Sequence, residues 1–390
     1  MSKQAGDSPA TRPVREERQP ASDSIDEVAP GILRLQLPIS MPGLGHVNCY
    51  ALEDSRGVAL IDPGLPGRKT WQLLNQRLTQ AGLPAKRVHT VLITHSHPDH
   101  FGQAQTLRAK FGAEIVTHSN FRTIFDPDHE NDDTDPEASF DPDPDPGLCS
   151  VGSDSCNHDP AEQPLRKASV NGATPNDSIF NAEVPWGGKP FELPMRRKAA
   201  YFMARRFGGK FWSLPKPTQR VEDSQVLTFG GQEWVAVHTP GHTADHLCLW
   251  NPANGVMISG DHILPTITPH ISGMSTTVDP LANFFDSLDR MKTFQNVNMV
   301  LPAHGQPFRD LVGRSDSIKV HHHERLKTLQ ESGNELGWGT VTQYMEKLFK
   351  QRSWGSMAES ETYAHLEHMR IEGKAAVNSE GSELRYSMLD

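Results

Sequence analysis

The sequence predicts an α/β fold in which sheets and helices form stacked layers. Three observations support this prediction. Apolar strands surround one amphipathic helix in residues 31–93, strand-like segments return in residues 224–262, and a helical pattern dominates after residue 304. A chain of 390 residues is long enough for two or three domains with separate cores.

Local patterns predict the elements of the first half. Apolar and polar side chains alternate in GILRLQLPIS, as they do in a strand with one buried face. Turn residues 54–57 then join two short apolar strands, and Gly82 marks the end of a helix. The predicted elements are strands at 31–40, 46–53 and 57–64, a helix at 69–82 and a strand at 88–94.

The C-terminal part of the chain has a different pattern. Apolar side chains recur at helical spacing in residues 316–332, 340–350 and 358–372, and a turn at 379–381 joins two short strands. Three helices and a hairpin predict a small winged-helix-like domain, which we assign to residues 316–390. The main domain is then assigned to residues 29–315, after a disordered tail at residues 1–28.

Two segments of the main domain differ in composition from the rest. Residues 121–165 contain thirteen Asp or Glu and one Arg, a net charge of −12, whereas the whole chain carries −10. The Asp and Pro run at about 125–165 lacks the spacing of a calcium loop, so we interpret it as a flexible acidic insertion. Residues 190–215 are basic and aromatic, and could cover a site, contact an anionic substrate or lie in water.

The composition excludes several classes of protein. No apolar run approaches the roughly 20 residues that cross a bilayer, and the N-terminus has neither a secretory nor a transit pattern. Four cysteines in so long a chain do not form a disulfide framework. We therefore expect a cytoplasmic protein without a membrane partner.

The segment THSHPDH, residues 94–100, concentrates three histidines and an aspartate directly after an apolar strand. Imidazole nitrogen and carboxylate oxygen are suitable ligands for zinc and similar divalent ions. In an extended turn, residues two apart point the same way, so His95 and His97 can share one ion. Asp99 and His100 would then face a second ion.

Three further segments supply candidate partners. His242 lies in HTPGHTADH, Asp261 in ISGDH and His304 in LPAHG. Each follows a short apolar strand and borders a glycine, which is the context expected if all of them meet at one edge of a sheet sandwich. Any one of these histidines could be structural, but the whole set indicates a metal site.

These motifs resemble those of a known family. THSHPDH, PGHT, SGDH and PAHG, in this order, are similar to the metal motifs of the metallo-β-lactamase-fold hydrolase superfamily over about residues 30–310. The resemblance implies a four-layer αβ/βα sandwich and a ligand set. In that set His95, His97 and His242 hold one ion, Asp99, His100 and His304 hold the second, Asp261 bridges them, and Asp62 in LIDPG orients a ligand histidine.

Within the superfamily, the motifs and the helical tail are most similar to the β-lactamase-like protein 2 branch, which also carries a C-terminal winged-helix domain. Glyoxalase II is a more distant relative with the same ligand set. The acidic insertion departs from the family pattern, and the missing cysteine ligand argues against true β-lactamase activity. The resemblance implies two divalent ions, Zn²⁺ in the first place and Fe or Mn as alternatives.

Such a pair of ions has a defined chemistry. Two ions about 3.5–4 Å apart can share a water and lower its pKa toward neutrality from about 15.7. The resulting hydroxide would attack an acyl carbonyl or a phosphodiester, while one ion polarises the substrate oxygen. Asp99 is the predicted catalytic residue, because it could also accept or relay a proton.

Other polar side chains near the motifs have weaker assignments. His270 and Arg205 are candidates for substrate binding, the first in a loop after Asp261 and the second in the basic segment. His262 is more simply explained by packing and His246 by support of its loop. The run at residues 321–323 places three histidines on a helix, where adjacent positions diverge, so we expect them in solvent.

Two enzymatic hypotheses remain for the substrate. The first is a small acyl compound, an ester, thioester or lactone; the second is single-stranded RNA, as in an endoribonuclease of the β-lactamase-like protein 2 branch. The last predicted helix carries four glutamates in residues 358–372, so its contact with nucleic acid is unfavourable. Its apolar side chains suggest packing on the main domain or on a second subunit in a homodimer. A non-enzymatic regulatory module is disfavoured, because no predicted ligand is missing.

Overall fold

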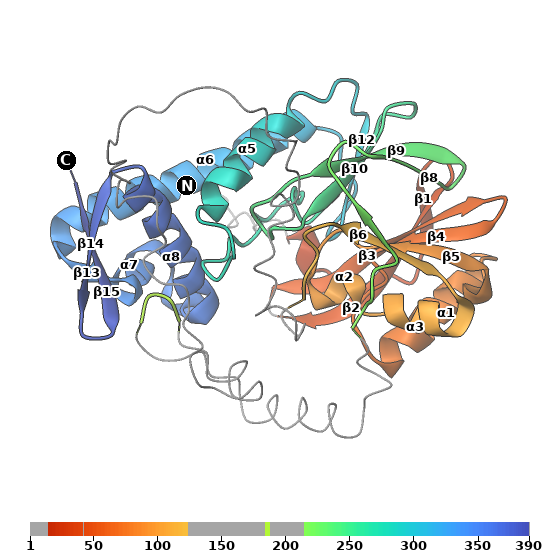
Figure 1. Ribbon diagram of the computed structural model, residues 1–390, viewed down its shortest axis with the longest axis horizontal. Helices are drawn as coiled ribbons and strands as arrows, with labels where there is room; N and C mark the ends of the chain where they lie inside the picture. Colours follow the sequence, from red (N-terminus) through yellow and green to blue (C-terminus); the bar gives the residue numbers. More distant parts are fainter. Residues whose placement is uncertain (1–14, 42, 124–183, 188–213, 390) are drawn as a thin grey trace, which may run out of the picture.

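The computed structural model of the protein describes residues 15–41, 43–123, 184–187 and 214–389. In this part of the chain two sheets face each other, and helices cover the outer face of each (Figure 1). The layers therefore run helix, sheet, sheet, helix, as the α/β prediction requires. A smaller sheet lies at the other end of the molecule, beside the C-terminal helices (Figure 1). No helix among the described residues is both long and apolar enough to cross a bilayer.

The first sheet places one strand edge beside the histidine-rich segment. Within the described ranges its order is β1(Ile25–Ala29), β2(Ile32–Met41), β3(Leu44–Asp54), β4(Gly57–Ile61), β5(Val88–Leu92), β6(Glu114–His118) and β7(Gln219–Val221). Neighbours are antiparallel from β1 to β4 and parallel from β4 to β7. Side chains of β3 alternate, because Val47 and Cys49 pack toward the outer helices while Tyr50 and Leu52 pack toward the second sheet.

Helices cover the outer face of this sheet. They are α1(Arg68–Gln80), α2(Pro98–Phe101) and α3(Ala104–Phe111), with the 3-10 turn η2(Ala85–Arg87). Leu74 and Leu78 of α1 and Leu107 of α3 are fully buried against the sheet. Burial of a leucine side chain contributes about 1.5–3 kcal/mol, so this one-sided apolar face accounts for the docking of the helices.

The second sheet has the order β12-β11-β10-β9-β8 within the described residues. Its strands are β8(Val226–Phe229), β9(Gln232–His238), β10(Leu247–Asn251), β11(Val256–Gly260) and β12(Met299–Pro302), and only β11 and β12 run parallel. Trp234 and Leu249 face the first sheet. The opposite face packs on α5(Pro280–Met291) and α6(Leu311–Leu336) through Phe284, Leu288 and Ile318.

The C-terminal elements include the three predicted helices and the predicted hairpin. They are β13(Gly339–Thr340), α7(Val341–Leu348), η6(Gln351–Ser353), α8(Ser356–Ile371), β14(Ala375–Glu380) and β15(Glu383–Met388). Thr340 and Gln343 form a reciprocal capping box at the start of α7. Tyr344, Leu366 and Tyr386 form the centre of this small core. The winged-helix likeness of these elements stays a prediction.

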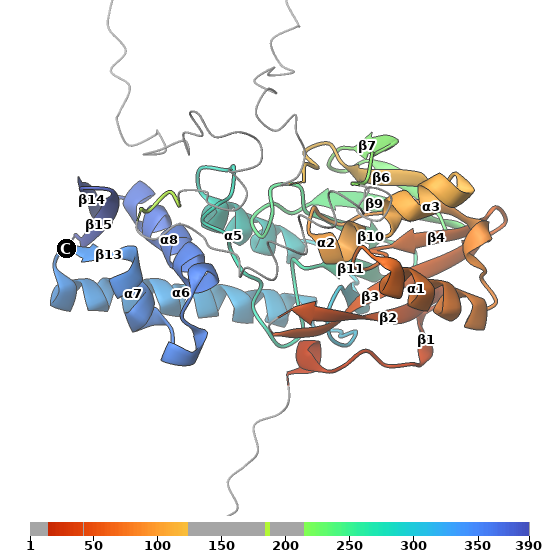
Figure 2. The ribbon, with the colours of Figure 1, turned by 90° about the horizontal axis from the view of Figure 1, so that it is seen from below.

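Two predicted boundaries need correction. The predicted disordered tail at 1–28 ends too late, because residues 16–18 form the 3-10 turn η1(Glu16–Arg18), Glu17 is buried, and β1 begins at Ile25. The boundary at residue 316 falls inside α6, which extends from the two-sheet body to the small sheet (Figure 2). The acidic insertion at about 125–165, and residues 190–213 of the basic segment, lie outside the described residues.

Candidate metal centre

The predicted ligands lie where strands of the two sheets end. His95 follows β5 by a short turn, while Asp99 and His100 occupy the first turn of α2, where Pro98 is the first helical residue. The loop from β9 to β10 carries His242. Asp261 follows β11, and His304 follows β12. The carboxyl ends of parallel strands meet at one edge of a sheet, which explains why residues so far apart in sequence converge here.

Two groups of side chains form within this region. The first contains His95, His97, His242 and Asp261, whose ligand atoms all lie within 4.8 Å of one another. Nδ1 of His97 is 2.9 Å from His95 Nε2 and 3.1 Å from His242 Nε2. The second contains Asp99, His100 and His304 within the same limit.

Asp261 lies between the two groups. Its Oδ2 is 3.7 Å from His242 Nε2 and 3.9 Å from His95 Nε2, both in the first group. The same oxygen is 3.6 Å from His100 Nε2, and Oδ1 is 3.2 Å from His304 Nε2, both in the second group. One carboxylate therefore faces ligand nitrogens of both groups.

Backbone carbonyls orient two of the histidines. His242 Nδ1 is 2.7 Å from the carbonyl oxygen of His270, and His304 Nδ1 is 2.6 Å from that of His46. Since a carbonyl only accepts, Nδ1 carries the proton in both rings and Nε2 keeps its lone pair. Metal-binding histidines characteristically donate their second ring N–H in this way.

Two further histidines, His95 and His100, are oriented by Thr94 and Asp62. Asp62 accepts from the Thr94 backbone N–H at 2.9 Å and from its hydroxyl at 2.7 Å, and His100 Nδ1 lies 2.8 Å from the same carboxylate. The Thr94 oxygen in turn accepts from His95 Nδ1 at 3.0 Å. Asp62 has a φ of 54°, which is strained for a side chain other than glycine and typical of functional sites.

The histidines differ in their pKa values. Burial, which disfavours the charged form, lowers the pKa of His95, His97 and His242, so these rings are neutral at pH 7 and their lone pairs are available. Burial opposes the charged form of His100 and His304 too, but the neighbouring carboxylates outweigh it and raise the pKa of both. A cation bound between them would replace protons that the carboxylates otherwise attract.

Unpartnered polar atoms test whether the residues fit a metal. Nε2 of His100 and His304 and Oδ1 of Asp99 and Asp261 are buried without a partner in hydrogen-bond geometry among the described residues. Buried polar atoms in folded proteins almost always have a partner, so unpartnered atoms on residues of both groups fit the binding of cations there. Nitrogen and oxygen donors in this number fit divalent ions such as Zn²⁺.

The remaining predicted site residues lie around this centre. The His270 carbonyl contacts His242, whereas its ring faces Glu361 of α8 at 3.4 Å. Arg205 lies outside the described residues. His246 supports its loop, as expected, because its Nδ1 lies 2.8 Å from the Thr239 hydroxyl oxygen; its Nε2 also accepts from the Asp261 backbone N–H at 3.0 Å. His262 is fully buried beside Phe284, which agrees with a packing role.

One prediction about the histidine run at 321–323 is wrong. His322 is fully buried, not in solvent, and its Nδ1 lies 3.0 Å from His365 Nε2. The helical pattern alone does not reveal this, because the position is covered only once α8 packs on α6. Sequence reasoning also misses His46; its Nε2 accepts from the Gly305 backbone N–H at 3.1 Å, a contact across 259 positions that no local motif signals.

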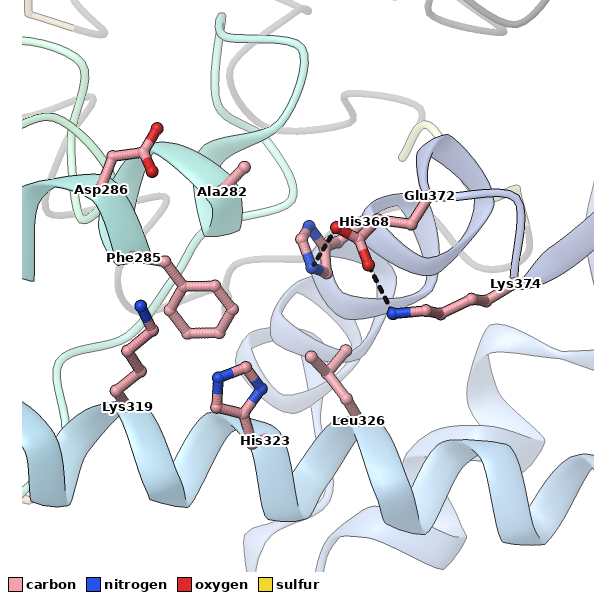
Figure 3. A pocket seen from close by; sticks show the side chains of 9 residues that line it. All are labelled: Ala282, Phe285, Asp286, Lys319, His323, Leu326, His368, Glu372 and Lys374. Atoms are coloured by element: carbon pink, nitrogen blue, oxygen red, sulfur yellow. Dashed lines mark hydrogen bonds and ion pairs between the residues drawn. The ribbon is translucent and has the colours of Figure 1, made fainter. Parts of the chain in front are cut away.

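Two other features, a pocket and a further His/Glu group, could bind a ligand but contain none of the predicted metal ligands. A pocket of about 330 Å³ opens between α5, α6 and α8 (Figure 3). Its lining contains none of the predicted ligands, and His368, Glu372 and Lys374 on one side of it are paired with each other. A third group with ligand chemistry is formed by His322, Glu361 and His365.

Solved structures with the same fold are known. A metallo-beta-lactamase family protein from Thermus thermophilus superposes with a TM-score of 0.63 and 23% identity, covering 93% of this chain and all of that one. A beta-lactamase domain protein from Burkholderia ambifaria gives 0.64 and 22%, with coverage of 95% and 96%. These likenesses show the fold of the described body.

Curated relatives match shorter segments. The atrochrysone carboxyl ACP thioesterase of Aspergillus fumigatus is 29% identical over 137 residues, 33% of this chain and 31% of that protein. A homologue of beta-lactamase-like protein 2 from Drosophila melanogaster is 27% identical over 173 residues, 42% of this chain and 54% of that protein. The chain thus spans only about a third to a half of the length of these relatives.

The family pattern described as the metallo-beta-lactamase superfamily matches residues 42–304. That range begins just before β3 and ends on His304, so it includes every strand end that carries a predicted ligand. The expected similarity to beta-lactamase-like protein 2 is confirmed by the matches to its homologues. Because the family pattern covers well over half of the sequence and the fold agrees with it, the chain belongs to the metallo-beta-lactamase superfamily.

Proposed function

We propose that the protein is a hydrolase that uses two adjacent divalent ions to cleave an acyl substrate, an ester, thioester or lactone. The observation that carries this proposal is the position of Asp261. Its carboxylate faces His242 Nε2 at 3.7 Å in one group and His304 Nε2 at 3.2 Å in the other. A carboxylate between two sets of neutral or neutralisable nitrogens is the arrangement that a binuclear site requires.

Each side chain has a role in this proposal. The first ion would be held by His95, His97 and His242, the second by Asp99, His100 and His304, and both by Asp261. When bound, such a pair activates a water and polarises the substrate oxygen. The second oxygen of Asp99 is buried and unpartnered, so it can accept a proton at the centre. Zn²⁺ suits this ligand set best, although imidazole and carboxylate also bind Fe and Mn.

The substrate class is supported by two observations. One relative is named as a thioesterase that acts on an acyl carrier protein, which favours a thioester among the acyl substrates. The last helix does not favour RNA, the alternative substrate, because nearly all side chains of α8 from Ala358 to Met369 are buried. A winged-helix-like domain whose third helix is covered cannot place that helix in a nucleic-acid groove.

The test is a substrate screen with metal-loaded protein. Thioesters, esters, lactones and single-stranded RNA are compared for the natural protein, for Asp99→Ala, and for Asp289→Ala as a control. Asp289 lies on α5, where it pairs with Lys292 and Lys319 and contacts none of the predicted ligands. We expect hydrolysis of an acyl substrate, reduced at least 100-fold by Asp99→Ala and unchanged by the control. Cleavage of RNA that Asp99→Ala abolishes, with no acyl hydrolysis, would reverse the proposed substrate class.

A further inference from the structure

The segment between β11 and α5, residues 262–279, is attached to the C-terminal helix α8. We call it the β11–α5 loop. The Gly273 backbone N–H donates to Ser360 Oγ at 3.0 Å. Ile271 is fully buried in the same apolar cluster as Ala364 of α8. A Cβ added at Gly273 would lie 2.5 Å from the Ser360 carbonyl oxygen, so loop and helix are in close contact.

The same loop touches the candidate metal centre through its backbone. The His270 carbonyl accepts from His242 Nδ1 at 2.7 Å, which leaves His242 Nε2 directed at His97. The direction in which His242 presents its lone pair therefore depends on where residue 270 is held. The two residues are 28 positions apart in the sequence, so this contact depends on how the loop is held.

Glu361 of α8 holds the other side of His270. Its Oε2 lies 3.4 Å from His270 Nδ1, and its Oε1 pairs with Arg325 of α6. The side chain is largely buried. Burial favours the neutral acid, but Arg325 and His270 outweigh it and hold the pKa of Glu361 far below its usual range, so the group is a carboxylate. Its negative charge is fixed by the arginine and directed at the loop.

The neighbouring histidines connect this support to α6. His365 Nδ1 donates to the Glu361 backbone carbonyl at 2.7 Å, which leaves Nε2 to accept from His322 Nδ1 at 3.0 Å. Both carboxylate oxygens of Glu361 already face Arg325 and His270. These bonds connect α8 to α6, although His322 Nε2 has no partner among the described residues.

We propose that Glu361 is a positioning residue of the metal centre: it acts from the C-terminal helix through His270 to fix the ring of His242. This inference rests on the proposed function, because it takes His242 as a ligand of the first ion. It makes α8 a wall of the site, so the C-terminal segment completes the hydrolase centre. Partners that orient metal-binding histidines typically change metal affinity or activity by about 10- to 100-fold when removed.

The experiment compares Glu361→Gln and Glu361→Asp with Glu359→Gln as the matched control. Glu359 lies on the same helix and accepts from the Thr342 hydroxyl at an exposed position. Zinc affinity is measured by competition with a chelator, the geometry of the first site by the absorption spectrum of Co²⁺-loaded protein, and folding by thermal unfolding. We expect Glu361→Gln to weaken zinc binding by about 10-fold or more and to change the Co²⁺ spectrum.

Glu361→Asp keeps the charge and should restore part of the affinity, and Glu359→Gln should match the natural protein. A Glu361→Gln variant with a lower Tm but unchanged zinc affinity and Co²⁺ spectrum would show a purely structural role and overturn the inference. If the proposed metal-dependent function were wrong, the result would differ, because the natural protein itself would bind no divalent ion.

Discussion

At the scale of single residues, four histidines of the candidate centre each have a ring partner outside the set of predicted ligands. Asp62 combines a strained backbone conformation with hydrogen bonds that orient a neighbouring histidine. Its left-handed backbone costs about 1–3 kcal/mol, and its carboxylate offsets this by accepting two bonds from Thr94 while it faces His100 Nδ1 at 2.8 Å. The strain is therefore retained where it orients a ligand.

Replacement of Asp62 should weaken metal binding more than folding. Asparagine tolerates the same backbone conformation but lacks the charge that favours the Nδ1–H tautomer of His100. We expect Asp62→Asn to lower metal affinity by about 10- to 100-fold, measured by chelator competition. Asp54→Asn, the same change at the far end of β3, serves as the control. Equal affinities of the two variants would contradict the assigned role.

The lowered pKa of the buried His118 should make the protein less stable at acidic pH. Burial, with help from the stacked ring of His238, lowers the pKa of His118 from 6.5 to about 4. Between these values the unfolded chain binds a proton that the folded protein does not, so stability falls as pH falls from about 6.5 to about 4. His118→Asn keeps an acceptor for the Asn120 N–H and cannot titrate.

Chemical unfolding at several pH values checks this prediction. The loss of stability between pH 6.5 and pH 4 should be smaller in His118→Asn than in the natural protein, by less than about 1.4 kcal/mol for each pKa unit. Parallel pH profiles of the two proteins would show that His118 contributes nothing to the acid sensitivity.

The seven candidate ligands could be selected from the sequence because each lies in a contiguous motif after an apolar strand. It could not predict His46, Thr94 or Glu361 as partners. Thr94 stands out only as part of a motif, and the others meet their partners across hundreds or tens of positions. Contacts of that kind follow from the packing of elements, which local periodicity does not encode.

At the scale of elements, the N-terminal turn η1 holds the start of the β11–α5 loop. Glu17 is fully buried and accepts from the backbone N–H groups of Thr266 at 2.7 Å and Ile267 at 3.0 Å, and from the Thr266 hydroxyl. Arg314 of α6 donates to the Ile267 carbonyl at 2.7 Å from the other side. The loop is thus fixed at two places, by η1 here and by α8 at His270.

Loss of Glu17 should destabilise the protein. Glu17→Ala would remove the acceptor of two part-buried N–H groups, so we expect a loss of about 2 kcal/mol. Glu16→Ala removes one exposed bond to the Gln306 N–H and should cost less than about 1 kcal/mol. Denaturant titrations measure both values. If Glu17→Ala and Glu16→Ala lowered the free energy of unfolding equally, the buried carboxylate of Glu17 would not be what anchors η1.

Strong periodicity did not guarantee prediction: two long helices were predicted, whereas the amphipathic helix α5(Pro280–Met291) was missed. The predicted helix at 69–82 is α1 with bounds of Arg68–Gln80, and the last predicted helix is α8. The strands β7(Gln219–Val221) and β13(Gly339–Thr340) have three and two residues. Segments so short have no readable alternation, and their pairing is set by β6 and β15 beside them.

At the scale of the whole molecule, the two predicted domains share a core. α6 crosses the predicted boundary, and Ile318 of α6 and Ala364 of α8 lie in the same cluster as Val237 and Leu288. His368 of α8 also pairs with Asp279 at the start of α5, at 2.9 Å. Sequence patterns separate such units by periodicity, but only packing shows that one apolar surface serves both.

Truncation tests this shared core. A chain of residues 1–315 would expose the face of α5 that α6 and α8 cover, so we expect it to be insoluble or to unfold without a cooperative transition. Expression and thermal unfolding of the truncated chain provide the measurement. A cooperatively folded, metal-binding product would restore the prediction of an independent domain ending at 315.

The most direct test of the central claim is the number of divalent ions bound by each chain. Metal analysis is made on the natural protein, on Asp261→Ala and on Asp289→Ala, a control whose carboxylate pairs with Lys292 and Lys319. If Asp261 joins two ion sites, the natural protein and the control should each bind two ions per chain, and Asp261→Ala should bind fewer and more weakly. A natural protein that binds one ion or none, or two ions that Asp261→Ala retains with the same affinity, would contradict the account.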